Sequence, residues 1–189
     1  MNTVELLETK LDFKKLIINP FPVFDIIMVF ILSCGDNKYC QGCQNEGDVD
    51  QFTPITKLPS VLGGSLEKVK KVACGREHTM MLLKDGRLFG IGHNQHGQIY
   101  GTQDTFKEFT EVQTLFLQNG DRIVDLYCTQ INTYLITEMG HVFWSGWENR
   151  SPEKDYLLVN APSSLKHIDL FHTNSNGVHC FLKSGRFCL

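Results

Sequence analysis

The chain has 189 residues, of which 42% are hydrophobic and 21% charged, and its formal net charge is −3. This is the composition of an ordinary globular protein with a core, and it excludes collagen-like and low-complexity chains. Acidic and basic residues are mixed and form no basic stripe, so direct nucleic-acid binding is not expected. Seven cysteines, an odd number, do not suggest a disulfide framework in a chain of this length. A reducing compartment, the cytoplasm or nucleus, is expected.

The segment 1–28 does not match the sequence pattern that follows, and we interpret it as an N-terminal extension. Asn2 has the character of a helix cap, with Glu5 three residues later. Leu7 and Leu11 follow at helical spacing, so the pattern predicts a short amphipathic helix here.

Residues 14–34 begin with two lysines, continue through an apolar stretch and end at Cys34. This pattern leaves open a membrane anchor or a secretory signal. Prolines at positions 20 and 22 and the carboxylate of Asp25 interrupt it, however, and the longest clean run is Ile26 to Leu32. A membrane-spanning helix needs roughly 18 apolar residues. A buried strand is therefore the favoured interpretation, and a membrane partner is not expected.

Self-comparison shows an internal repeat whose clearest copy runs from Val69 to Gly101. In order, the copy contains an apolar run, Cys-Gly, His-Thr, a second apolar run, Asp-Gly, a third run and Gly-x-Asn-x-x-Gly-Gln. We expect the recurring polar and glycine residues to have structural roles; in this copy they are Cys74, Gly75, His78, Thr79, Gly86, Gly92, Asn94, Gly97 and Gln98.

Shifting this copy along the chain locates three more. The forward shift that carries Cys74 onto Cys128 gives the matching positions Thr133, Gly140 and Gly146. A further forward shift carries Gly140 onto Gly185, and a backward shift of the clearest copy gives Gly35, Asn37 and Gln41. The spacing between copies is typical of β-propeller blades, which have roughly 40 to 50 residues. We therefore predict units at about 29–65, 66–120, 121–164 and a truncated 165–189 within one array, 29–189.

The apolar runs are four to six residues long, as in strands, and the fold class predicted is all-β. Asp85-Gly86 predicts a two-residue hairpin turn of type I′. Gly92 and Gly146 would let the chain bend away from a third strand toward the next blade. The architecture expected is a partial β-propeller of four-stranded antiparallel blades.

The combination Cys-Gly-x-x-His-Thr, Asp-Gly and Gly-x-Asn-x-x-Gly-Gln resembles the repeat of the regulator of chromosome condensation family. The resemblance is strongest over 69–101 and implies seven-bladed propellers. The departures include Cys40 at the position of Gly97, and Asn132 at the position of His78. Seven blades need about 350 residues, so this chain supplies three to three and a half. We therefore expect a fragment, a damaged copy or part of an assembly, with open blade edges able to self-associate.

No group of residues has the pattern of an active site. Cys40 and Cys43 have metal-like spacing, but a structural zinc site needs four ligands. His93 and His96 are expected to be surface histidines of a turn. No catalytic, cofactor-binding or metal-binding residues are predicted, and no cofactor. Trp147, next to a turn glycine, belongs to a residue type that often anchors partners.

The resemblance implies a non-catalytic protein–protein interaction module rather than an enzyme. Its most specific form is a guanine-nucleotide-exchange regulator of a small GTPase, and a chromatin-associated protein is another partner it implies. The exchange residues of the family match no positions here, so none are carried over. Two alternatives remain open: a membrane-tethered or secreted propeller domain anchored by residues 14–34, and a degenerate inactive fragment.

Overall fold

The computed structural model describes the backbone of residues 3–9, 28–45, 47–147, 156–158, 170–173, 179–183 and 186–188. Side chains are described for 31–45, 47–147 and 156–158.

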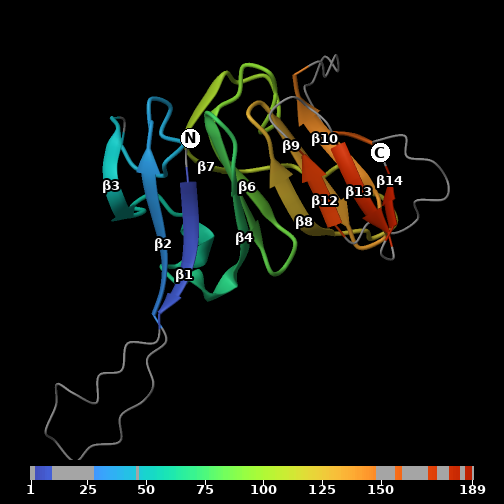
Figure 1. Cartoon of the computed structure of the whole chain (residues 1–189), viewed down its shortest axis with the longest axis horizontal. Helices are drawn as coiled ribbons and strands as arrows, with labels where there is room; N and C mark the ends of the chain where they lie inside the picture. The colour runs from blue at the N-terminus through green and yellow to red at the C-terminus, as the bar shows by residue number, and fades with distance from the viewer. Residues whose placement is uncertain are drawn as a thin grey trace, which may run out of the picture.

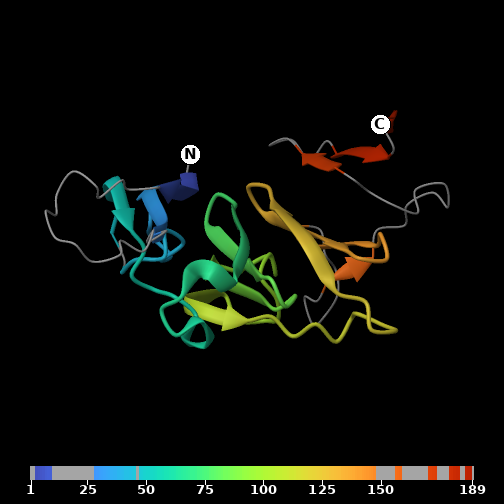
Figure 2. The same cartoon turned by 90° about the horizontal axis from the view of Figure 1, so that it is seen from below.

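The described strands form four antiparallel sheets, which stand side by side in sequence order (Figures 1 and 2). We call these sheets the first to fourth blades. The first contains β1 (Thr3–Thr9), β2 (Met28–Gly35) and β3 (Val49–Pro54). The second contains β4 (Val69–Cys74), β5 (His78–Leu83), β6 (Leu88–His93) and β7 (Thr105–Glu111). The third contains β8 (Ile123–Cys128), β9 (Asn132–Thr137), β10 (Val142–Gly146) and β11 (Leu157–Leu158). The fourth contains β12 (Leu170–Thr173), β13 (His179–Lys183) and β14 (Arg186–Cys188).

The predictions of an all-β fold and of four-stranded antiparallel blades are confirmed, with four strands described in the second and third blades and three in the first and fourth. Within the described residues the helical elements are two 3-10 turns, η2 (Ser60–Leu62) and η3 (Leu66–Lys68), both in the connection between the first and second blades. The repeat also recurs in detail. The β6–β7 and β2–β3 ladders both shift register before a glycine at matching positions, Gly92 and Gly35.

The helix predicted near the N-terminus is wrong, because Thr3–Thr9 forms strand β1. This strand pairs with β2 along its whole length, from Thr3 opposite Cys34 to Thr9 opposite Met28. A helix of so few residues is marginal in water, whereas pairing with a neighbouring strand satisfies the backbone hydrogen bonds of both. In Figure 1, β1 lies between β2 and β4. It pairs with β2 as β5 pairs with β6 in the second blade.

The segment considered as a membrane anchor falls partly on strand β2, which includes its last residues, 28–34. Positions 10–27 lie outside the described residues. In the part of the chain that is described, no helix has the length and apolar character needed to cross a bilayer.

The hairpin turn at Asp85-Gly86 differs from the prediction. Gly86 has φ +90°, but Asp85 is not among the residues with positive φ, so the turn is not type I′. Leu83 N–H donates to Arg87 O, enclosing a three-residue loop that ends in glycine. The Asp85 carboxylate accepts the Arg87 N–H at 3.1 Å, which stabilises the loop without a strained aspartate. The third blade repeats this loop, with Thr137 bonded to His141 and Gly140 at φ +82°.

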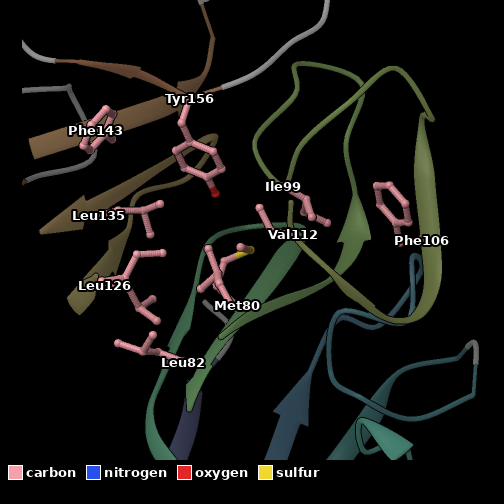
Figure 3. Packing of buried hydrophobic residues seen from close by; sticks show 11 residues of the cluster. Met80, Leu82, Ile99, Phe106, Val112, Leu126, Leu135, Phe143 and Tyr156 are labelled. Atoms are coloured by element: carbon pink, nitrogen blue, oxygen red, sulfur yellow. The ribbon is translucent and has the colours of Figure 1, made fainter. Parts of the chain in front are cut away.

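The apolar core lies mainly between blades. Figure 3 shows side chains of the second and third blades packed face to face, with Met80 and Leu82 on one side and Leu126 and Leu135 on the other. A second cluster joins the first and second blades through Ile31, Met81, Leu83 and Phe89, among others. Neighbouring residues of one strand therefore pack against opposite neighbours, as the alternation of side chains along a strand requires.

Two strands of neighbouring blades, β4 and β8, are also joined by an ion pair. Lys71 Nζ lies 2.7 Å from Asp125 Oδ1 and 3.7 Å from the centre of the Tyr127 ring. The Tyr127 hydroxyl donates to the other carboxylate oxygen of Asp125 at 2.9 Å. These contacts connect the second and third blades beside the apolar core.

Candidate functional site

The loop that follows the third strand of the second blade is organised by one buried amide. Asn94 Oδ1 accepts the Ile99 N–H at 2.7 Å, and Asn94 Nδ2 donates to the carbonyls of Tyr100 and Gln103 at 2.8 and 2.7 Å. Asn37 acts in the same way in the first blade, where its Oδ1 accepts the Gly42 N–H at 2.7 Å. The two loops follow β2 and β6, which occupy matching positions in their blades, so both loops lie at the same end of their blades.

One threonine joins each of these two loops to the following blade. Thr79 Oγ1 donates to Gln41 O at 2.6 Å, and Thr133 Oγ1 donates to Gln98 O, also at 2.6 Å. All four residues are buried. The glutamine side chains also hold the loops: Gln98 Oε1 accepts the His96 N–H at 3.0 Å. We call these two threonine–carbonyl hydrogen bonds the blade latches.

His78 extends the second latch. Its Nε2 lies 3.0 Å from Thr133 Oγ1, whose proton is already donated to Gln98 O, so Nε2 carries the hydrogen of that contact. Burial, with a smaller contribution from His93, lowers the pKa of His78 to about 3. The imidazole is therefore neutral at ordinary pH. Gly75 lies against this ring, and a Cβ there would collide with it.

The glycines at the ends of the third strands are required by close backbone approach. Gly92 has φ +112°, and a Cβ there would collide with Glu77 O; Gly146 has φ +132°, and its Cβ would collide with Ile131 O. The next position of the pattern, Gly97, has φ +73°, and Cys40 keeps the left-handed conformation at φ +63° in the first blade. Cys74 ends β4, where its sulfur lies 3.3 Å from the Thr79 hydroxyl oxygen. Gly185 lies outside the described residues.

The loops carry a continuous row of rings across three blades, which we call the ring row: Tyr39, His93, His96 and Trp147. Tyr39 and His93 are stacked with centroids 4.5 Å apart. His93 meets His96 at 6.3 Å, and His96 meets Trp147 edge to face at 4.6 Å. Trp147 is 51% exposed, which is unusual for a tryptophan in contact with another ring.

Charged groups border the ring row. Glu77 Oε2 lies 3.2 Å from His93 Nδ1, and Arg76 Nε lies 3.8 Å from the same carboxylate. The ammonium of Lys38 lies 4.9 Å from the Tyr39 ring centre. A row of one exposed and three half-buried rings, with mixed charges at its border, has the anatomy of a protein contact site.

Cys40 and Cys43, the two cysteines with metal-like spacing, are suited to packing rather than chemistry. Cys40 and Cys43 are buried between the first and second blades. Burial raises the pKa of the Cys43 thiol well above its usual value, which disfavours the reactive thiolate. Among the residues described, no group of three or more histidines, cysteines and carboxylates is placed to hold a metal ion.

Comparison with protein families decides the identity of the repeat. Residues 69–98 and residues 30–82 each match a model of the regulator of chromosome condensation (RCC1) repeat. The chain is a regulator of chromosome condensation repeat protein. The fold agrees: the crystal structure of Prp20p from Saccharomyces cerevisiae superposes on 96% of this repeat protein with a TM-score of 0.60 and 15% sequence identity. The chain is thus part of a β-propeller, as the sequence predicts.

Two curated relatives of this repeat protein come from mouse. The RCC1-like G exchanging factor-like protein is 28% identical over 103 residues, and the X-linked retinitis pigmentosa GTPase regulator is 33% identical over 127. These matches cover 52% and 61% of the repeat protein, but only 22% and 13% of the relatives. The chain also spans 46% of Prp20p.

Sequence reasoning missed the ring row of this repeat protein. It placed both histidines in a surface turn, where His96 lies, whereas His93 ends strand β6 with its side chain 14% exposed; it assigned neither a partner. The two histidines are neighbours in the second blade, but Tyr39 and Trp147 come from other blades and are more than 50 residues away from them, so only the stacking of blades brings the four rings together. One signal was available: Tyr39 and His96 occupy the same repeat position, as do His93 and Trp147.

Proposed function

We propose that this repeat protein is a non-catalytic protein-interaction module that binds its partner through the ring row. The observation that carries the proposal is the exposed Trp147, held edge to face by His96 at 4.6 Å. An aromatic side chain that is exposed yet held in place by neighbours gives contact area at low entropic cost. The buried asparagine and glutamine side chains hold the loops that carry Tyr39 and His96, so this part of the surface is formed before a partner arrives.

The finer proposal is a regulator of a small GTPase. Two relatives support it by name, one an exchanging factor-like protein and the other a GTPase regulator. Prp20p is described by its binding properties to Gsp1p and histones, which supports a GTPase or a chromatin-associated partner for this chain. We propose a cytoplasmic or nuclear location on the same grounds, and structural roles for the repeated polar and glycine residues.

Binding of the purified chain to a panel of purified small GTPases tests both proposals, the interaction module and the GTPase regulator. Interferometry with nucleotide-free and nucleotide-loaded forms measures affinity, and release of a fluorescent guanine nucleotide measures exchange. Trp147→Ala should weaken binding about tenfold or more, as expected for an aromatic anchor. Leu115→Ala is the matched control, because Leu115 is 86% exposed in the loop after β7, which leaves the opposite end of the second blade.

The outcomes distinguish the interaction module from the exchange regulator. Binding that Trp147→Ala weakens, without accelerated nucleotide release, would support the interaction module and reject exchange. Equal loss in Trp147→Ala and Leu115→Ala would reject the ring row as the contact surface.

A further inference from the structure

Each blade interface has a face that receives the preceding blade. In the second blade, that face consists of Phe89, Ile91 and Phe109, which pack against residues of the first blade and of the connection that follows it. Phe89 is 5% exposed and Ile91 is 0% exposed. In the third blade Phe143, at the position of Phe89, packs against the second blade.

The first blade has an equivalent face with nothing described against it. The repeat alignment that places Gly92 on Gly35 relates the three side chains of the second blade to Leu32, Cys34 and Phe52. Ile31 and Ser33, which alternate with Leu32 and Cys34 along β2, are 2% and 0% exposed, and Ile31 packs with the second blade.

Because successive side chains of a strand point to opposite faces, Leu32 and Cys34 belong to the face turned away from the second blade. Both are half-buried, and Phe52 is 53% exposed. These three residues form what we call the outer face.

We propose that the outer face is a docking site for a further blade of the same repeat, contributed by a second copy of this chain. The chemistry of the face supports this occupant. Its three residues are apolar and uncharged, and at both described interfaces the equivalent face is covered by a blade of this repeat. The docking would continue the stacking that already joins the first three blades, and it is independent of the ring row.

The size of the chain agrees with this occupant. The chain spans 46% of Prp20p and 42% of human WBSCR16, another solved structure similar to it at a TM-score of 0.60. Two copies therefore supply close to the number of blades in such a protein. If the fourth blade of each copy meets the outer face of the other, the two contacts are equivalent and the pair closes on itself.

Light scattering after size-exclusion chromatography tests the proposal on the full chain. The chain has a mass of 21.5 kDa, and we expect about twice that value at concentrations approaching ~200 µM. Phe52→Glu places a charge in the contact and should raise the dissociation constant at least about tenfold, returning the mass to 21.5 kDa. The substitution is at an exposed position, so folding is preserved; circular dichroism checks this. Leu115→Glu, at an exposed leucine between the second and third blades, should leave the pair intact.

A monomer at the highest concentration would overturn the proposal, and so would equal weakening by the two substitutions. Larger assemblies that Phe52→Glu disperses would support the docking site and reject the closed pair. Maleimide labelling gives an independent readout, because Cys34 lies on the outer face. Its labelling, located by peptide mass spectrometry, should be slower at high than at low protein concentration. An unchanged rate would also overturn the proposal.

Discussion

The hydroxyl of Thr133 and the carbonyl of Gln98 form a hydrogen bond of 2.6 Å between the second and third blades. The same relationship joins Thr79 to Gln41 between the first and second blades. The second and third blades thus each bond to a backbone carbonyl in the loop of the preceding blade. Since these loops carry Tyr39 and His96, the latches position part of the ring row as well as the blades.

Thr133→Val removes a buried hydroxyl without changing the size of the side chain. Gln98 O loses its donor and His78 Nε2 loses its acceptor, and an unsatisfied buried group costs about 1–3 kcal/mol. We expect the free energy of unfolding in urea to fall by that amount. Thr102→Val, at an exposed position, should change it by less than about 0.5 kcal/mol. Equal effects in the two variants would contradict a role for the latch.

His78 should make stability depend on pH. Burial lowers its pKa to about 3 in the folded chain, whereas an unfolded histidine titrates near 6.5. As pH falls below about 6.5, the unfolded chain binds a proton that the folded chain excludes, so stability is complete above that pH and declines toward pH 3. The loss is roughly 1.4 kcal/mol per pH unit, or about 2 kcal/mol between pH 7.5 and 5.

The variant His78→Asn isolates the contribution of this histidine to the pH dependence of stability, since Asn132 occupies the same position in the third blade. Denaturant unfolding of both proteins at pH 7.5 and 5 measures the difference. The variant should lose about 2 kcal/mol less than the wild-type chain over this range. Parallel pH profiles would show that His78 is not the group responsible.

Gly92→Ala should be among the most damaging single changes in the second blade. The residue has φ +112°, and an added Cβ would collide with backbone atoms of Glu77 and His78. A cost of about 3 kcal/mol or more is expected, because rigid backbone must move. Gly101→Ala is the control: it has φ +64° but nothing within 4 Å of the added atom, so only the conformational cost of about 1–2 kcal/mol remains. Thermal unfolding ranks the two, and a smaller effect at Gly92 would contradict the structure.

The Lys71–Asp125 pair should contribute to stability between blades. Both side chains are 33% exposed, so solvent screens the pair, and a coupling of about 0.5–1 kcal/mol is expected. A double-mutant cycle with Lys71→Met and Asp125→Asn measures this coupling, which should decrease as salt is added. The Asp85–Arg87 pair within one hairpin is more exposed, at 52% and 39%, and should couple less strongly. A coupling near zero for Lys71 and Asp125 would show that apolar packing alone joins these strands.

The hairpin at Asp85-Gly86 shows which features of a turn its local sequence predicts and which it does not. The glycine correctly marked a turn with positive φ, but the number of loop residues was wrong. Loop length depends on which backbone groups of β5 and β6 pair, and those pairs include Leu83 with Arg87, beyond the dipeptide itself. The prediction of an N-terminal helix was wrong for a related reason. Its partner β2 begins only at Met28, and no local pattern at Thr3–Thr9 indicates that pairing.

The sequence alone determined the repeat, its period, the all-β class and the positions of the turn glycines and loop asparagines. These features are local or periodic, because they depend on backbone conformation within one blade or on alternation along one strand. Only the tertiary structure decided that Thr133 meets Gln98, that Tyr39, His93, His96 and Trp147 form one row, and that Phe52 remains exposed. Those relationships depend on how one blade stacks on the next, and the burial of apolar faces between blades sets that geometry.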